Sequence, residues 1–391
     1  MANLFLASNL VGLEAGHLQI VFQADPLDLA ALQEVEVQAP PDFFQGNWRY
    51  PAFGRDHASH TDHYGEADNY KIVALDGPGH NADQMWQLFG QLDASFRVYG
   101  SEINYEFLQN SNSFVTTLLW ALGIDLADYD MTTAGISYFP GDAANVLLGA
   151  HTDAGLVTPI AVKVALTAFD DVLHTGIGND SIGGLMGSAG DDRVWLGGGD
   201  DTVAGGTGQD RLHGQSGNDT VLGGGGEDLL FGGLGDDIML GGTGKDSLYG
   251  GRGDDSLYGG YNVDGMTGSQ SDVIDGGLGS DFLSGGEGRG RDRFVFHSID
   301  ETAAGDGRDT IFLMKQADLI DLSLIDANIG RDGDQAFRFH GASPHAFQLW
   351  YEDLGKGNYL ISGDVTGDRR ADFEIGLQEF SGSLDRGNFV L

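Results

Sequence analysis

A repeat of nine residues governs the middle of this chain. From Gly187 to Thr267 the sequence divides into consecutive blocks of nine, such as GGTGKDSLY and GGRGDDSLY. The sixth position of every block is aspartate: Asp192, Asp201, Asp210, Asp219, Asp228, Asp237, Asp246, Asp255 and Asp264. The eighth position is always apolar: Val194, Val203, Leu212, Val221, Leu230, Met239, Leu248, Leu257 and Met266. Low complexity alone would not keep two residue classes locked nine apart, so the pattern predicts a regular coil rather than a disordered linker.

Each block combines a turn with a short strand. Glycines adopt the backbone conformations of tight turns that other residues resist, and those at the first position (Gly205, Gly223, Gly232, Gly241 and Gly250) expose carbonyl oxygens along the turn. The three residues after the turn are predicted to form a strand whose position-eight side chain enters a thin core. Two blocks complete one coil of a parallel β-roll, so aspartates eighteen residues apart stack on the same edge. Asp192, Asp210, Asp228, Asp246 and Asp264 are expected on one edge, with Asp201, Asp219, Asp237 and Asp255 on the other.

Stacked carboxylates of this kind require cations. Neighbouring strands lie about 4.8 Å apart, where two unit charges repel by roughly 0.8 kcal/mol even in bulk water. A hard divalent cation between the carboxylates and the turn carbonyls reverses the sign of this interaction. Calcium is the usual ion of such flexible, oxygen-only sites, so the repeats predict several bound Ca²⁺ ions and a roll that folds with them.

The blocks resemble RTX repeats, the hemolysin-type GGxGxDxUx family of proteins exported by type I secretion. The resemblance implies that successive turns on one edge share each calcium ion. Degenerate blocks at 175–183 (TGIGNDSIG) and 276–284 (GGLGSDFLS) are expected to extend the roll.

Charge and composition exclude several classes of partner. The chain has 20 Lys and Arg against 59 Asp and Glu, a formal net charge of -39, which argues against nucleic acid and anionic membrane surfaces. It has no cysteine, which excludes disulfides and cysteine-ligated zinc. No apolar run of eighteen residues occurs, so no transmembrane segment is expected, and the N-terminus does not read as a classical secretory signal.

The composition changes twice along the chain and predicts a multidomain protein. Between residues 176 and 290 lie 38 of the 64 glycines, and we place the roll at 170–290. Residues 1–160 are expected to form an α+β domain, with strands at His17–Gln23, Leu32–Gln38 and Tyr70–Leu75 and helices at 81–94 and 111–122. Residues 291–391 are rich in aromatic, strand-like sequence and are expected to be mostly β.

The last hundred residues resemble the C-terminal secretion domain of serralysin-type proteins. The motifs are FVFHSIDETAAGDGRDTIFLMKQADLIDLSLIDAN, DQAFRF, GDVTGDRRADFEI and the terminal NFVL. The resemblance implies an uncleaved export signal at the C-terminal end and the type I secretion machinery as a partner. The serralysin protease is not expected, because HExxH is absent. Asp364, Asp368 and Asp372 are predicted to form a turn between strands, since the glycine and final acid of an EF-hand loop are missing.

The N-terminal domain resembles the permuted papain-like group, which includes NlpC-type peptidases and lecithin:retinol acyltransferase. The resemblance rests on HLQIVF, beginning at His17, and on NSNSFV, beginning at Asn110. It implies Ser111 as the nucleophile and His17 as its base, with Glu36 or Glu34 orienting the imidazole. Serine stands where that family has cysteine, and a serine hydroxyl needs a base in hydrogen-bond contact.

Two function classes follow. In the first, the protein is an extracellular hydrolase or acyltransferase that acts on an amide or ester through Ser111, His17 and Glu36. In the second, Ser111 or Asn110 merely caps a helix, and the protein is a non-catalytic extracellular binding or matrix protein. Both place the chain outside the cell, with surface association and the identity of the substrate or ligand left open.

Overall fold

The computed structural model divides the chain into two compact units, residues 1–184 with 192–198, and residues 185–191 with 199–391. In the first 162 residues it describes Gln91 and the backbone of the strands named below; beyond them it describes residues 163–166, 171–176, 178–183, 188–260, 271–287 and 290–391. The predicted helices at 81–94 and 111–122 lie outside the described residues, apart from Gln91, which is helical. Among the described residues, no helix is long and apolar enough to cross a membrane.

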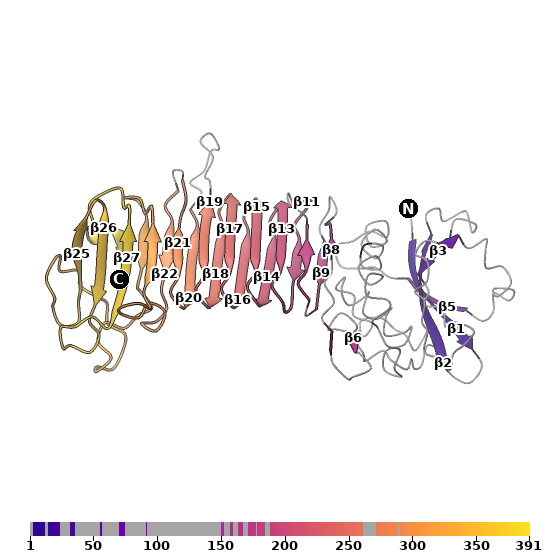
Figure 1. Ribbon diagram of the computed structural model, residues 1–391, viewed down its shortest axis with the longest axis horizontal. Helices are drawn as coiled ribbons and strands as arrows, with labels where there is room; N and C mark the ends of the chain where they lie inside the picture. Colours follow the sequence, from indigo (N-terminus) through magenta and orange to yellow (C-terminus); the bar gives the residue numbers. More distant parts are fainter. Residues whose placement is uncertain are drawn as a thin grey trace. The chain divides into compact units, whose positions relative to one another are not determined.

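The first unit contains an antiparallel sheet with the strand order β4-β3-β2-β1-β5 (Figure 1). Its strands are β1 (Asn3–Val11), β2 (Ala15–Gln23), β3 (Leu32–Val35), β4 (Arg55–Asp56) and β5 (Tyr70–Ala74). Strands β2, β3 and β5 confirm the strands predicted around residues 17, 32 and 70. A second antiparallel pair joins β6 (Ala150–His151) to β7 (Val157–Thr158).

The same unit holds the first parallel strand pairs of the repeat segment. Strand β8 (Lys163–Val164) pairs with β10 (Ser181–Ile182), and β9 (Val172–His174) pairs with β12 (Arg193–Trp195). Ile182, in the degenerate block 175–183, is fully buried. The predicted extension of the repeat pattern to this block therefore agrees with the structure.

The second unit contains a parallel β-roll, as the repeats predict. One sheet takes β11 (Ser188–Ala189), β13 (Thr202–Thr207), β15 (Thr220–Gly225), β17 (Ile238–Thr243), β19 (Ser256–Gly260), β21 (Phe282–Ser284) and β23 (Asp309–Phe312). The facing sheet takes β14 (Arg211–Ser216), β16 (Leu229–Leu234), β18 (Ser247–Arg252), β20 (Val273–Leu278), β22 (Arg293–Val295), β24 (Leu319–Asp321) and β28 (Phe389–Val390). Figure 1 shows β13 to β19 pointing one way and β14 to β20 the other, because the chain changes sheet after every block.

The register confirms both the period and the core. Val203 lies opposite Val221, which lies opposite Met239, so equivalent positions stack every eighteen residues. All position-eight side chains from Val194 to Leu257 are fully buried. Each half-turn therefore contributes one apolar side chain to the core between the sheets. The backbone turns make up both edges of the roll.

The C-terminal part adds a parallel strand to each sheet of the roll, β27 (Phe373–Gln378) to one and β28 to the other, and extends the first sheet with antiparallel strands. Strand β27 runs parallel to β23, whereas β26 (Asn358–Gly363) and β25 (Leu349–Gly355) are antiparallel. A short 3₁₀ helix, η6 (Arg386–Asn388), precedes β28. Large side chains such as Phe337, Phe373 and Phe389 are buried here, so this part packs like an ordinary globular core.

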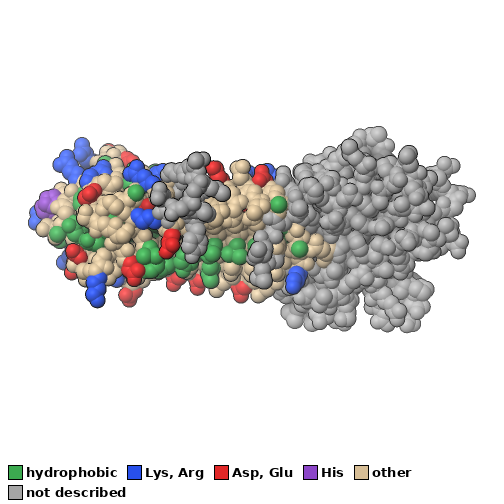
Figure 2. Space-filling view, turned by 90° about the horizontal axis from the view of Figure 1, so that it is seen from above, with side chains coloured by type: hydrophobic (Ala, Val, Ile, Leu, Met, Phe, Trp, Pro, Cys, Tyr) green, Lys and Arg blue, Asp and Glu red, His purple; other side chains and the backbone are tan. Residues whose placement is uncertain are grey.

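Aromatic side chains stack on the outer surfaces of the roll. His213, Phe231 and Tyr249 stack in sequence on β14, β16 and β18. Figure 2 shows a strip of hydrophobic side chains along the roll, with acidic side chains beside it. Since these positions repeat every coil, like side chains meet across neighbouring strands and stabilise the sheet.

Candidate calcium sites

Two rows of buried aspartates follow the edges of the roll. In the first row, a hydrogen bond of 2.9 to 3.1 Å runs from the backbone N–H of one aspartate to the carboxylate Oδ1 of the next, one coil later, along Asp210, Asp228, Asp246, Asp272, Asp292 and Asp318. The second row repeats the pattern at 2.8 to 2.9 Å: Asp201, Asp219, Asp237, Asp255, Asp281 and Asp309. The predicted division of the aspartates between two edges is thus how the described part of the roll is built.

In seven of these aspartates the second carboxylate oxygen has no hydrogen-bond partner among the described residues. This oxygen is the buried Oδ2 of Asp219, Asp228, Asp237, Asp246, Asp255, Asp281 and Asp309. These side chains are at most 3% exposed. Burying a carboxylate oxygen without a hydrogen bond costs free energy. Because the same oxygen is buried in coil after coil, we infer that it contacts a bound ligand instead of a hydrogen-bond donor of the protein.

Carbonyl oxygens converge on the same positions. A methyl group added at Gly223 would lie 2.5 Å from Asp228 Oδ2 and 2.6 Å from the carbonyl oxygen of Gly241 in the next coil. Gly241 shows the same arrangement, with Asp246 Oδ2 at 2.6 Å and the Gly259 carbonyl at 2.5 Å. The glycine at position one therefore keeps the space in which a carboxylate and a carbonyl oxygen meet. This all-oxygen donor set fits calcium.

Burial also opposes the charge of these carboxyl groups. It raises the pKa of Asp228, Asp237, Asp246 and Asp255 to about 7, against the lowering effect of the backbone N–H bond. Neighbouring carboxylates raise it further: Asp210 and Asp191 act on the pKa of Asp228. Without a cation the rows are thus only partly ionised near neutral pH, and an ion between the turns would restore the charged form.

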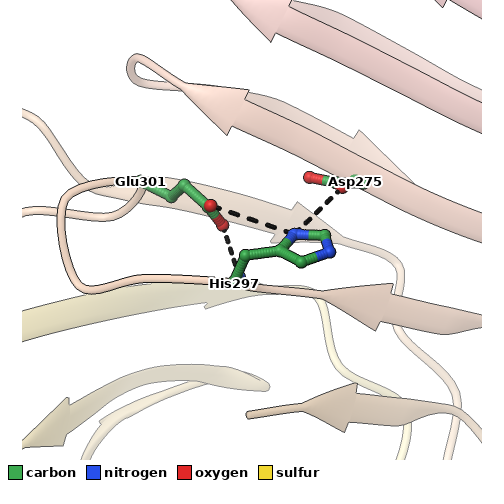
Figure 3. A group of neighbouring side chains, drawn as sticks. All are labelled: Asp275, His297 and Glu301. Carbon is green, nitrogen blue, oxygen red and sulfur yellow. Dashed lines mark hydrogen bonds and ion pairs between the residues drawn. The ribbon is translucent and has the colours of Figure 1, made fainter. Parts of the chain in front are cut away.

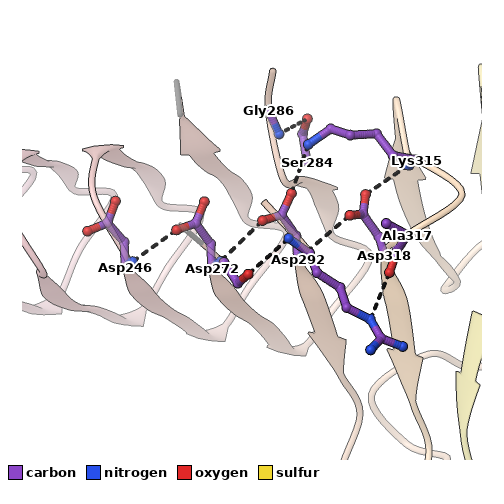
Figure 4. Close-up of polar contacts among 10 residues, drawn as sticks. Asp246, Asp272, Ser284, Gly286, Asp292, Lys315, Ala317 and Asp318 are labelled. Carbon is purple, nitrogen blue, oxygen red and sulfur yellow. Dashed lines mark hydrogen bonds and ion pairs between the residues drawn. The ribbon is translucent and has the colours of Figure 1, made fainter. Parts of the chain in front are cut away.

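The two rows end differently. In the first, the Lys315 ammonium lies 3.1 Å from Asp292 Oδ2, and the Lys315 backbone N–H donates to Asp318 Oδ2 at 2.8 Å (Figure 4). In the second, the Asp309 N–H donates to the Thr302 hydroxyl, and burial raises the pKa of Asp309 to about 9. A lysine therefore supplies the terminal positive charge of one row, while the other ends on an uncompensated carboxyl.

A further ladder lies on the solvent side of the turns, at position five. Asp200 accepts from the N–H of Asn218, Asn218 from Asp236, and Asp236 from Asp254, each at 2.9 Å. In this ladder the backbone N–H of the later coil donates to a side chain of the earlier coil, whereas in the buried rows the earlier coil donates to the later one. Each turn is thus tied to the next through side chains on both its inner and its outer side.

One predicted row member has to be corrected. Asp264 lies outside the described residues, and the row passes directly from Asp246 to Asp272, whose Oδ1 accepts the Asp246 N–H at 2.9 Å. The step is 26 residues rather than eighteen. Gly259 still faces Asp272 as position one faces position six, so eight extra residues interrupt this block between its second and fifth positions. Counting in nines across this insertion placed Asp264 where Asp272 stands.

The continuation of the rows beyond the regular repeats was missed, apart from Asp281 in the predicted extension. A signal for it exists in the sequence. Asp272, Asp292, Asp309 and Asp318 are each followed two residues later by a fully buried apolar side chain, namely Ile274, Phe294, Ile311 and Ile320. This is the relation of positions six and eight, and at Asp318 it occurs without the regular glycine pattern. A search for an aspartate followed two residues later by an apolar strand residue would have found these positions.

Asp192, a predicted row member, lies in the first unit, where its Oδ1 accepts the Asp171 N–H at 2.8 Å, the same relation that links successive members of the rows. Asp364, Asp368 and Asp372 lie in the loop between β26 and β27, as predicted, and each accepts backbone N–H groups.

The predicted catalytic residues are only partly described. His17 lies on β2, opposite Asn9 of β1, whereas Ser111 and Glu36 lie outside the described residues. Glu34 pairs with Val21, four residues along β2 from His17, which corresponds to about 13 Å.

Comparison with known proteins identifies the repeats. Residues 166–184, 185–212, 205–239, 231–264 and 265–291 match the family described as RTX calcium-binding nonapeptide repeat (4 copies). RTX hemolysin-type repeats are present in this chain, and they imply Ca²⁺ binding. No curated protein sequence matches the chain.

Solved structures that resemble the chain include two repeat modules and a lipase. The AlgE6R2 subunit of the Azotobacter vinelandii mannuronan C5-epimerase is 26% identical, over 41% of this chain and 90% of that one, with a TM-score of 0.28. The AlgE6R3 subunit is 25% identical, over 43% and 80%, with a TM-score of 0.24. The extracellular lipase LipA from Serratia marcescens is 16% identical, over 59% and 42%, with a TM-score of 0.23. At these TM-scores the likeness carries no argument about activity.

Proposed function

We propose that this chain is a secreted calcium-binding protein whose roll folds on meeting calcium outside the producing cell. The observation that carries the proposal is the repeated buried Oδ2 without a hydrogen-bond partner, set beside a glycine carbonyl of the next coil. Extracellular calcium modules have Kd values of roughly 10⁻⁴ to 10⁻³ M. A roll tuned to that range stays unfolded in a calcium-poor cytoplasm and folds outside, because metal binding to sites absent from the unfolded chain is itself folding free energy.

Export is proposed to depend on the C-terminal end and on the type I secretion machinery. The support is the resemblance of residues 291–391 to serralysin-type secretion domains together with the RTX repeats. Deleting the last sixty or so residues should leave the protein inside a producing cell that carries the matching transporter. A passenger that replaces residues 1–160 should still be exported, and undiminished export of the truncated chain would refute this part of the proposal.

For the N-terminal domain the proposed activity is hydrolysis or acyl transfer at an amide or ester, with Ser111 as nucleophile, His17 as base and Glu36 as the group that orients it. The support is the motif order and the position of His17 on a central strand of the sheet. Ser111→Ala and His17→Ala should each abolish the activity, and the double variant should resemble either one, since the residues would act as a unit. Ser113→Ala is the matched control.

A serine-reactive acylating probe tests this activity without knowledge of the substrate. Labelling of the wild-type chain but not of Ser111→Ala supports the enzyme. Absence of labelling across a broad panel of probes would favour the non-catalytic binding or matrix protein instead.

A further inference from the structure

An imidazole and two carboxylates meet outside the rows of aspartates. Asp275 lies on β20, His297 follows β22, and Glu301 lies four residues further on, in the segment that leads to β23. His297 Nδ1 is 3.2 Å from Asp275 Oδ2 and 3.9 Å from Glu301 Oε1 (Figure 3). One ligand atom from each residue lies within 4.8 Å of the other two. Two neighbouring strands of one sheet, and the segment that follows the second, thus bring three metal-ligating groups to one point.

The two carboxylates are buried, whereas the imidazole is open to solvent. Asp275 is 8% and Glu301 9% exposed, and the His297 side chain is 47% exposed. Burial raises the pKa of Asp275 and of Glu301. Among the described residues, His297 is the only basic group that pairs with either carboxylate, since Arg308 pairs with Glu374 and Lys315 with Asp292.

The donor set separates this cluster from the calcium rows. Calcium takes oxygen ligands, whereas imidazole nitrogen suits first-row transition metals such as zinc. Zinc binds nitrogen at about 2.0–2.1 Å and carboxylate oxygen at about 2.0–2.2 Å, so ligand atoms on a tetrahedral ion stand roughly 3.3–3.5 Å apart. The distance of 3.2 Å between His297 Nδ1 and Asp275 Oδ2 is close to this separation, and Glu301 Oε1, at 3.9 Å from His297 Nδ1, needs to approach that nitrogen by about half an ångström.

One carboxylate is already held in place for this role. Glu301 Oε2 accepts the His297 backbone N–H at 2.6 Å, which leaves Oε1 toward the imidazole. Such hydrogen bonds to a ligating carboxylate orient it toward the metal. The exposed side of His297 leaves room for water as the remaining ligand.

We propose that Asp275, His297 and Glu301 bind one first-row transition-metal ion, with Zn²⁺ as the preferred ion, at a site separate from the calcium rows. The ion joins β20 to the segment between β22 and β23. It thereby ties two successive coils near the C-terminal end of the roll to one another.

The test is a calorimetric titration of zinc into the full-length protein saturated with calcium. Wild type should bind one more zinc ion than His297→Gln does. It should bind that ion at least tenfold more tightly than Glu301→Gln does. Glu301→Gln keeps an oxygen that can accept the His297 N–H, so the loop is retained. His213→Gln, a histidine stacked on Phe231 outside the cluster, is the control and should bind zinc as wild type does.

Zinc X-ray absorption gives a second readout that does not depend on the variants folding alike. The wild-type spectrum should show nitrogen and oxygen ligands with one imidazole. Equal zinc stoichiometry and affinity in wild type, His297→Gln and Glu301→Gln would overturn the site, as would a spectrum without imidazole; the three residues would then form an ion-paired cluster only.

Discussion

Asp228 in the roll and Asp364 in the C-terminal part are both buried aspartates, but their carboxylates are satisfied in different ways. Asp228 receives one backbone N–H on Oδ1, and its Oδ2 has no hydrogen-bond partner among the described residues. Asp364 receives the N–H of Gly367 on Oδ1, at 2.5 Å, and that of Arg369 on Oδ2, at 2.6 Å. The loop around Asp364 completes its own polar contacts, whereas Asp228 and its equivalents, such as Asp237 and Asp246, leave one carboxylate oxygen for an ion.

The two regions also differ in the size of their apolar cores. The roll contributes one buried apolar side chain per half-turn, such as Val221 or Leu230, whereas the C-terminal part buries Phe337 against Phe373 with ring centroids 5.7 Å apart. A thin core stabilises little on its own, since burial stabilises in proportion to apolar area. The comparison indicates that calcium contributes a large part of the roll's stability and little of that of the C-terminal core.

Acidity should produce the largest contrast between the regions. The folded pKa of Asp228, Asp237, Asp246 and Asp255 is about 7, above an unfolded value near 3.9. The stabilisation from protonation is therefore complete below about pH 4 and is lost as pH rises through 7. In chelator, far-UV circular dichroism should show more β structure at pH 5.5 than at pH 8.

Protons and calcium compete for the same oxygens, so the calcium midpoint for folding should rise more than tenfold from pH 8 to pH 5.5. A calcium midpoint that does not depend on pH would contradict the assignment of these carboxylates as ligands.

Replacing single aspartates should separate the regions next. Asp228→Ala removes a carboxylate from the middle of a row and should raise the calcium midpoint roughly tenfold or more, by analogy with the loss of groups that support a metal site. The more peripheral Asp192→Ala should shift it less. Asp364→Ala should lower the melting temperature of the C-terminal part and leave the calcium midpoint unchanged; a shift equal to that of Asp228→Ala would remove the distinction.

Glycine substitutions within one coil sharpen the same point. Gly223→Ala places a methyl group on Asp228 Oδ2 and the Gly241 carbonyl, where the space for the ion lies. It should cost about 1–3 kcal/mol, as overpacking does, with a higher calcium midpoint. Gly225→Ala is the matched control, because its methyl group would meet only the Thr243 hydroxyl, at 3.0 Å, as a close neighbour. Equal calcium titrations of the two variants would refute the role given to Gly223.

The smallest of these effects is expected at the lysine cap. Lys315→Met removes the ammonium from Asp292 and should raise the calcium midpoint a few-fold, since Asp292 is buried while Lys315 is partly exposed. Arg308→Met breaks a more exposed pair with Glu374, and such pairs contribute about 0–1 kcal/mol. Calcium titrations of both variants check this, and an effect of Arg308→Met as large as that of Lys315→Met would contradict the capping role.

Local spacing was sufficient to predict the regular part of the fold. Asp228 and Leu230 repeat with fixed separation, and the alternation between two sheets follows from two blocks per coil. The eight-residue insertion before Asp272 was not predicted, because an insertion that preserves the three-dimensional period breaks the period in the sequence. The lysine cap and the Asp275–His297–Glu301 cluster depend on contacts between separate coils, which no local pattern contains.

Hydrogen exchange of the full-length protein, read peptide by peptide by mass spectrometry, tests most directly whether the roll is built around calcium. With millimolar calcium, the backbone amides of β13 to β20 should be protected. With chelator at pH 8 they should exchange as in an unfolded chain, while peptides from β25 to β27 keep a larger share of their protection. Equal protection of β13 to β20 with and without calcium would contradict a roll that calcium folds.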